Sequence, residues 1–207
     1  MTQGFFIVFE GGDGAGKTTQ ALMLEQALEK HGREVVQTRE PGGTKLGQEI
    51  RQLLLHGEAV DPRAEALLYA ADRAHHVATL VRPALHRGAV VIQDRYIDSS
   101  AAYQGAAREL GEPEIRKLSE WGTGQLQPDL TIVLDIDPVV GAARRDKRGL
   151  QADRLEAESL EFHRVVREAF LHYAEVAPHR YLVLDATMDM VDLHAQITAR
   201  LGAMGLL

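Results

Sequence analysis

The sequence predicts a doubly wound α/β fold built on a five-stranded parallel sheet. Short apolar runs alternate along the chain with longer segments of helical periodicity, which is the order expected of consecutive βα units. The runs are continuously apolar, as in strands that helices cover on both faces. In folds of this type ligands bind at the carboxyl ends of the strands, so the residues that follow each strand are the candidates for function.

Five segments have the composition expected of strands in such a sheet. Each is short and apolar and lacks the polar alternation of a half-exposed strand. In chain order they are residues 5–9 (FFIVF), 35–37 (VVQ), 90–93 (VVIQ), 130–135 (LTIVLD) and 181–185 (YLVLD).

The first helix is predicted to follow the first strand after a glycine-rich loop. Ala21, Leu24 and Leu28 recur at helical spacing in this segment. Gly32 lies where a helix commonly ends, because glycine adopts the left-handed conformation of that position at little cost.

Two longer helices are predicted over residues 64–81 and 156–176. The first is expected to end before Pro83 and the second before Pro178, because the residue that precedes a proline disfavours the helical conformation. No repeat, low-complexity tract or obvious linker divides the chain, so a single domain over residues 1–207 is expected.

The amino-acid composition argues against several classes of protein. The net charge of −7 argues against a general binder of nucleic acids or anionic membranes. The chain has no cysteine, hence no disulfide or thiolate metal site, and its nine histidines form no metal-ligand pattern. No apolar run approaches the ~18 residues that span a bilayer, and no signal-peptide pattern begins the chain. A cytoplasmic, soluble protein without nucleic-acid or membrane partners is expected.

The stretch EGGDGAGKTTQ, residues 10–20, carries the strongest motif. Gly11, Gly16, Lys17 and Thr18 fit G-x-x-x-x-G-K-[ST], the phosphate-binding loop. Glycines let the backbone N–H groups point at phosphate oxygens, and the next helix adds its positive N-terminal end. The alternative is a glycine-rich turn that matches by chance, but the flanking buried strand and helix are the context that the motif requires.

The rest of the sequence narrows the nucleotide chemistry. The chain has no asparagine, so the N-K-x-D motif by which GTP-binding switches read guanine is absent. Residues 144–154, RRDKRGLQADR, are dense in charge. They form either a solvated loop or a mobile lid that brings arginines onto phosphates. A small kinase fits both the chain length and such a lid.

Several motifs together resemble the thymidylate kinase family over nearly the whole chain. They are the phosphate-binding loop, TREPGGT (38–44), IRQLLL (50–55), LLYAADRA (67–74), DRY (94–96), SSAAYQG (99–105), QPDLTIVLD (127–135) and DRLE (153–156). The resemblance implies one P-loop nucleoside monophosphate kinase domain with a lid at about residues 141–155. The implied reaction transfers the γ-phosphoryl group of ATP to dTMP, giving dTDP and ADP. A kinase for another nucleoside monophosphate and a non-catalytic nucleotide-binding protein are the alternatives.

The resemblance also implies a donor site and a source of charge for the transferred group. The attacking phosphate oxygen is already anionic, so catalysis is expected from positioning and charge neutralisation rather than from a general base. One branch of the family carries Arg where this chain has Gly14, so a lid arginine is expected to supply the cation; Arg148, before Gly149, fits best. The implied catalytic residues are Lys17, Arg95, Arg148 and Asp13. The implied ATP-binding residues are Gly11, Gly12, Asp13, Gly14, Ala15, Gly16, Lys17, Thr18, Thr19 and Arg144.

Tyr69 and Arg73 lie four residues apart, so both project from one face of a predicted helix. The resemblance implies that Tyr69 stacks on thymine and that Arg73 hydrogen-bonds its carbonyl edge. The alternative for Tyr69 is a core aromatic residue. The alternative for Arg73 is a surface salt bridge with Glu65 or with a neighbour of Asp72.

The remaining dTMP contacts are expected after the second and third strands. The resemblance implies that Arg95 and, with less support, Arg39 bind the dTMP phosphate. It implies that Tyr103 crowds a 2′-hydroxyl and that Gln104 reads the thymine edge. Ser99 is close enough to contribute a hydroxyl, and a helix N-cap is its alternative role.

Mg²⁺ is the implied cofactor. The Thr18 hydroxyl would bind the ion, and Asp94 would lie near it and contact it through water; a strand-end cap is the alternative for Asp94. The resemblance further implies a homodimer, for which the predicted helices at 64–81 and 156–176 offer candidate apolar faces.

Overall fold

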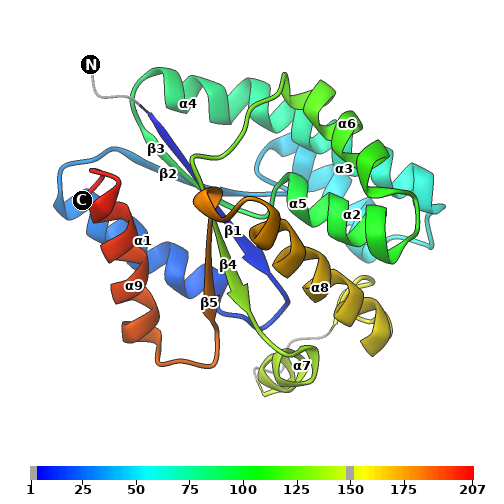
Figure 1. The fold of residues 1–207 in the computed structure, drawn as a ribbon. Helices are drawn as coiled ribbons and strands as arrows, with labels where there is room; N and C mark the ends of the chain where they lie inside the picture. The colour runs from blue at the N-terminus through cyan, green and yellow to red at the C-terminus, as the bar shows by residue number, and fades with distance from the viewer. Residues whose placement is uncertain (1–3, 148–151) are drawn as a thin grey trace.

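The computed structural model describes residues 4–147 and 152–207. Five parallel strands form one sheet in the order β2-β3-β1-β4-β5, as Figure 1 shows. The fold class predicted from the sequence is confirmed. The strands are β1 (Phe5–Gly11), β2 (Val35–Arg39), β3 (Val90–Asp94), β4 (Leu130–Asp135) and β5 (Tyr181–Asp185).

The strand order places the ends of β1, β2 and β3 next to one another. β1 is central and pairs with β3 on one side and with β4 on the other. Phe9 of β1 and Arg39 of β2 both align with Asp94, the last residue of β3. Since the chain order reverses beside β1, this edge is the position where ligands bind in doubly wound folds.

Helices cover both faces of the sheet (Figure 1), which explains why the strands are continuously apolar. Ile7 and Phe9 pack into a core on the side of α1 (Lys17–Lys30) and α9 (Met190–Ala203). Phe6 and Val8 point to the opposite face and pack with residues of α4 (Arg82–His86) and its neighbours. Both sets are almost fully buried, as alternate residues of a strand covered on both sides should be.

The second face carries the elements that surround the site. α3 packs against both α2 and α6, and the π-helical segment η2 packs against α6 and α8. These and the remaining elements are α2 (Lys45–His56), α3 (Pro62–His76), η1 (Val77–Val81), α5 (Ile97–Ser100), η2 (Ala101–Ala107), α6 (Glu112–Thr123), α7 (Pro138–Asp146), α8 (Leu160–Val176) and η3 (Pro178–Arg180).

The predicted helix over 64–81 differs from the structure at both ends. α3 begins earlier, at Pro62, because the Asp61 carboxylate caps the N–H groups of Arg63 and Ala64. The helical path does not stop before Pro83 but continues through η1 into α4. The prediction was wrong because Pro83 lies in the first turn of α4, where its missing N–H costs little.

The predicted helix over 156–176 begins later than expected. The Ser159 hydroxyl accepts a hydrogen bond from Phe162 N at 3.1 Å, which sets the start of α8 at Leu160. Residues ahead of it form a turn, in which the Asp153 carboxylate accepts the N–H groups of Leu155 and Glu156. The end before Pro178 is confirmed.

The end of α1 is as predicted. Gly32 has a φ of 75°, and the N–H groups of Gly32 and Arg33 bond back to Glu29 and Leu28. This pattern closes the helix in the way that glycine favours. Within the described residues, no helix is both long enough and apolar enough to cross a lipid bilayer.

Candidate active site

A cavity of about 250 Å³ lies at the carboxyl ends of β1, β2 and β3. Residues predicted from five separate sequence motifs meet in its wall. Those that line it are Asp13, Gly14, Ala15, Gly16, Lys17, Thr18, Thr19, Arg39, Tyr69, Arg73, Asp94, Arg95, Ser99, Tyr103 and Gln104. Arg144 does not line this cavity, and Arg148 lies outside the described residues.

The phosphate-binding loop joins β1 to α1. Lys17 is the first residue of α1, and its Nζ donates to the backbone oxygens of Gly11 and Gly12, each at 3.0 Å. Burial lowers the pKa of Lys17, against the opposing charge of Asp94. The loop therefore holds an ammonium group and the N-terminal end of a helix beside one cavity.

Gly14 is needed in the loop for two reasons. Its φ is 78°, which side chains rarely adopt. A Cβ at Gly14 would also collide with the backbone oxygen of Gly141 in α7, and a Cβ at Gly141 would collide with the backbone oxygen of Asp13. The loop and α7 thus touch backbone to backbone.

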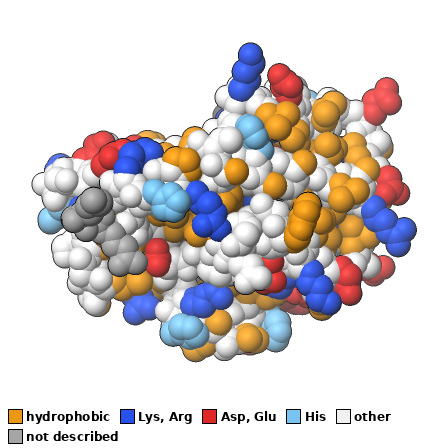
Figure 2. All heavy atoms as spheres, turned by 90° about the horizontal axis from the view of Figure 1, so that it is seen from above, with side chains coloured by type: hydrophobic (Ala, Val, Ile, Leu, Met, Phe, Trp, Pro, Cys, Tyr) orange, Lys and Arg blue, Asp and Glu red, His pale blue; other side chains and the backbone are white. Residues whose placement is uncertain are grey.

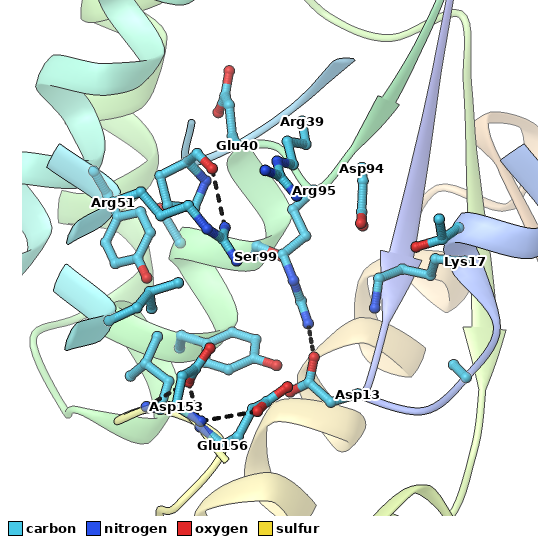
Figure 3. A pocket seen from close by; sticks show the side chains of 18 of the residues that line it. Asp13, Lys17, Arg39, Glu40, Arg51, Asp94, Arg95, Ser99, Asp153 and Glu156 are labelled. Carbon is cyan, nitrogen blue, oxygen red and sulfur yellow. Dashed lines mark hydrogen bonds and ion pairs between the residues drawn. The ribbon is translucent and has the colours of Figure 1, made fainter. Parts of the chain in front are cut away.

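Asp13 and Arg95 face each other across the cavity, as Figure 3 shows. Arg95 Nη2 donates to Asp13 Oδ1 at 2.6 Å, and Arg95 Nη1 donates to Ser99 Oγ at 3.1 Å. Burial alone would raise the pKa of Asp13, but the charges of Arg95 and Lys17 lower it below its usual value. Arg95 has a φ of 67°, so the turn after β3 holds it in a left-handed conformation that few residues adopt.

Ser99 is fixed in turn by Glu10, which sequence reasoning did not single out. The Glu10 carboxylate accepts from Ser99 Oγ at 2.6 Å, from Ser99 N at 3.1 Å and from Tyr96 N at 2.8 Å. Burial, together with the charge of Asp98, raises the pKa of Glu10 to about 7. Ser99 lies inside α5 and caps no helix, so the N-cap alternative was wrong.

Three arginines from separate elements point into the cavity (Figure 3). Arg39 ends β2, Arg95 follows β3, and Arg51 comes from α2, where Nη1 donates to the backbone oxygen of Pro41 at 3.1 Å. Burial and the charge of Arg39 lower the pKa of Arg51. Arg51 was not predicted as a site residue, although it belongs to the motif IRQLLL (50–55). Together the guanidinium groups suit a doubly charged phosphate.

Arg73 is buried and is not part of a surface salt bridge, so that alternative was wrong. Its Nε donates to Glu40 Oε2 at 2.8 Å, and Nη1 donates to Ser119 Oγ at 2.9 Å. Nη2 donates to the backbone oxygen of Tyr96 at 3.1 Å and to Ser100 Oγ at 3.0 Å. These bonds fix the plane of the guanidinium at the cavity wall.

Glu40 itself is held by a second buried partner. His76 Nδ1 lies 2.9 Å from Glu40 Oε1, and His76 Nε2 lies 2.7 Å from Thr38 Oγ1. The first and third residues of the TREPGGT motif, Thr38 and Glu40, are thereby tied to α3. His76 thus has a structural role.

Two aromatic side chains and one amide side chain form the cavity wall near Arg73. Tyr69 lines the cavity and also belongs to the core beneath it, so both roles weighed for it are compatible with its position. The Tyr103 hydroxyl is buried and makes no hydrogen bond within residues 4–147 and 152–207. The Arg95 guanidinium lies over the Tyr103 ring, 5.2 Å from its centroid. Gln104 donates through Nε2 to Glu65 Oε1 at 2.8 Å.

Asp94 and Thr18 form a donor set that fits Mg²⁺. Both line the cavity, and Asp94 Oδ1 is buried without a hydrogen-bond partner among the described residues. In that part of the chain no cluster of three or more His, Cys, Asp or Glu side chains could hold a metal ion. A carboxylate and a hydroxyl beside a phosphate site are nonetheless the ligands that Mg²⁺ uses when phosphates complete its coordination.

The segment around the predicted lid begins inside α7. Arg144 and Arg145 lie in the last turn of that helix. Arg144 Nη1 donates to the backbone oxygen of Ala186 at 2.8 Å, whereas Arg145 lines the cavity. Asp153, within the range predicted for the lid, and Glu156, just after it, also line the cavity and were not predicted as site residues.

Comparisons with known proteins agree with this geometry. The sequence pattern of the family described as thymidylate kinase matches residues 9–197. A thymidylate kinase of Clavibacter sepedonicus is 58% identical over 198 residues, covering 95% of this chain and 94% of the relative. A thymidylate kinase of Deinococcus radiodurans is 50% identical over 206 residues, covering 99% of this chain and 100% of the relative.

A solved structure shows the same fold. The crystal structure of thymidylate kinase from Ehrlichia chaffeensis superposes with a TM-score of 0.79 at 32% identity. The match covers 96% of this chain and 99% of that one.

Proposed function

Because the chain belongs to the thymidylate kinase family, we propose that the cavity bounded by the phosphate-binding loop and the arginine cluster is its active site. The chain is an ATP-dependent kinase that phosphorylates dTMP to dTDP. The observation that carries the site assignment is the meeting of two different recognition surfaces in one cavity. A loop suited to a polyphosphate lies opposite arginines and an aromatic-amide wall suited to a nucleoside monophosphate.

The donor ATP is placed on the loop side. The backbone N–H groups of the loop and the start of α1 suit its phosphates. Arg144 lies outside the cavity, and its bond to Ala186 places it at the end of β5, so any contact it makes is with a part of ATP beyond the phosphates. The proposed ATP-binding residues are those predicted: Gly11, Gly12, Asp13, Gly14, Ala15, Gly16, Lys17, Thr18, Thr19 and Arg144.

The acceptor dTMP is placed on the opposite side. Arg95 and Arg39 suit its phosphate, with Arg51 as a further cation. Tyr103, with its unpartnered hydroxyl, is proposed to border the sugar. Tyr69 supplies a ring face for the base, and Arg73 and Gln104 supply polar groups for its edge.

The proposed catalysis rests on charge and position. A dTMP phosphate oxygen attacks the γ-phosphorus of ATP, and the bond to the β-γ bridging oxygen breaks, so that ADP leaves. Lys17 and Arg95 neutralise charge on the two reacting phosphates, and Asp13 together with Ser99 aligns the Arg95 guanidinium. No side chain needs to remove a proton.

Mg²⁺ is proposed as the cofactor, held by the Thr18 hydroxyl and the Asp94 carboxylate. The buried, unpartnered Asp94 Oδ1 is the observation that supports it. Held there, Mg²⁺ would supply positive charge that offsets part of the negative charge of the phosphates.

The function is tested by coupled ADP release with dTMP, dUMP, dCMP, dGMP and AMP as acceptors. We expect the highest kcat/KM with dTMP. A clear preference for another acceptor would replace dTMP as the substrate, and nucleotide binding without turnover would favour the non-catalytic alternative.

A lid arginine is proposed to complete the charge on the transferred group. With Gly14 in the loop, Lys17 has no arginine beside it, and Arg148 remains the sequence-based candidate for a further cation. We expect Arg148→Ala to lower kcat at least about a hundredfold, less than the full effect of an arginine finger because the acceptor arginines share the charge. Arg145→Ala should cost clearly less. Steady-state kinetics of the two variants side by side test this, and equal minor losses would mean that neither cation acts on the phosphoryl group.

We further propose a homodimer formed through the outer face of α2, α3 and α6. Figure 2 shows hydrophobic side chains gathered on the side of the molecule where Figure 1 places these helices. Leu53 of α2 is 55% exposed, Leu67 of α3 is 58% exposed, and Trp121 of α6 is 82% exposed. Exposed apolar residues on neighbouring helices are typical of an interaction surface.

Sedimentation at micromolar protein should give about twice the chain mass of 22.8 kDa. Leu67→Glu places a charge on this face and should shift the protein towards the monomer, whereas Leu22→Glu, on exposed α1, should not. A wild-type protein that sediments only as a monomer would contradict the proposal.

A further inference from the structure

Glu65 sets the orientation of the Gln104 side-chain amide. Glu65 lies near the start of α3 and is fully buried. Its Oε1 accepts a hydrogen bond from Gln104 Nε2 at 2.8 Å. An ionised carboxylate only accepts hydrogen bonds, so the NH₂ group of Gln104 must face it. Gln104 Oε1 is then turned away from Glu65, and Gln104 lines the cavity.

Glu65 is itself held in place by two arginines. Its Oε2 accepts from Arg154 Nη2 at 2.5 Å, and Arg154 Nε donates to the backbone oxygen of Leu54 at 2.8 Å. Arg108 Nε lies 3.6 Å from Glu65 Oε1. The positive charges of Arg154 and Arg108 compensate the buried negative charge of Glu65. Arg154 bonds to one carboxylate oxygen, and Gln104 bonds to the other.

The cavity wall therefore offers a fixed hydrogen-bonding pattern. Gln104 presents an acceptor, while Arg73, held through Glu40 and three other groups, has only donors to present. The 4-keto pyrimidines match this pair, because N3 carries a hydrogen beside the O4 acceptor. Cytosine is mismatched at both positions, because its N3 is an acceptor beside a donating amino group.

We propose that Glu65 is a positioning residue for base specificity. By locking the Gln104 amide it makes the site accept a 4-keto pyrimidine and reject a 4-amino one. This inference rests on the proposed placement of dTMP, with the base beside Tyr69, Arg73 and Gln104.

Glu65→Gln tests the proposal. The single side-chain oxygen of the new amide should pair with the Arg154 guanidinium, so its NH₂ group would face Gln104. The Gln104 amide would then turn, presenting its own NH₂ group to the base. We expect the ratio of kcat/KM for dTMP to kcat/KM for dCMP to fall at least about tenfold. A larger collapse is not expected, because Arg73 still disfavours the amino group.

The readout separates positioning from general damage. Each ratio is measured on one protein sample, so loss of folded enzyme affects both substrates equally and cancels. Arg108→Met is the matched control, because it removes a cation beside Glu65 but leaves the bond from Gln104 intact; its ratio should stay within about threefold of wild type. If this ratio falls less than tenfold in Glu65→Gln, the proposal is overturned. A fall of equal size in Arg108→Met would also overturn it. Turnover of dTMP by the wild-type protein in the same assay tests the proposed function independently of the role of Glu65.

Discussion

Lys17→Ala is expected to lower kcat by on the order of a thousandfold, while dTMP affinity changes little. The ammonium group lies on the loop that we propose binds the donor phosphates, and it is held by the backbone oxygens of Gly11 and Gly12. Its charge acts most strongly as charge shifts between the reacting phosphates, so its loss should appear in kcat. Stopped-flow or coupled steady-state kinetics with both substrates varied measure this effect, and calorimetry measures dTMP binding.

Lys30→Ala is the control for charge alone. Lys30 ends the same helix and is exposed, far from the loop in sequence. The Lys30→Ala substitution removes the same positive charge from the chain and should leave kcat unchanged. Near-normal turnover of Lys17→Ala would show that the loop does not act in catalysis.

Arg95→Ala is expected to have a comparable effect, but on the acceptor side. The Arg95 guanidinium bonds to both Asp13 and Ser99, and it points into the cavity together with Arg39 and Arg51. Its removal takes away the fork for the dTMP phosphate and leaves the Asp13 carboxylate without its partner. We expect kcat/KM for dTMP to fall on the order of a thousandfold, with KM for ATP nearly unchanged.

Two further variants sharpen this test. Arg95→Lys keeps the positive charge but cannot bind two partners and a phosphate at once, so it should restore only part of the loss. Arg87→Ala breaks an exposed pair with Glu34, whose side chains are 49% and 56% exposed, and should leave kinetics unchanged. If KM for dTMP is unaltered in Arg95→Ala, Arg95 does not bind the acceptor.

The sequence predicted those elements that can be recognised from a short run of consecutive residues. The strands were readable because their residues are apolar on both faces, as Ile7 and Val8 illustrate by packing into opposite cores. The phosphate-binding loop was readable because its chemistry needs glycines and Lys17 at fixed spacing. Motif resemblance predicted candidate acceptor residues after β2 and β3, and the structure brings Arg39, Arg95 and Tyr103 into the wall of one cavity.

Contacts between residues that are far apart in the chain could not be predicted from the sequence. Glu10 bonds to Ser99 across 89 positions of the chain, and Arg154 bonds to Glu65 across the same separation. No periodicity or spacing indicates such pairs, because packing of whole elements brings them together. The π-helical path through Val77–Val81 was missed for a related reason, since the tertiary context decides how a chain passes a proline.

The backbone contact between Gly14 and Gly141 has a consequence for the order in which substitutions in this chain could be tolerated. An arginine in place of Gly14 would put a Cβ where the Gly141 oxygen lies, so α7 would have to shift before the side chain fits. Arginine at this loop position and α7 seated as it is here are therefore sterically incompatible. Because each clash is with a backbone oxygen, replacing the other glycine does not relieve it. Exchange at either position therefore requires a prior shift of a whole segment, which makes it an epistatic transition rather than a gradual drift.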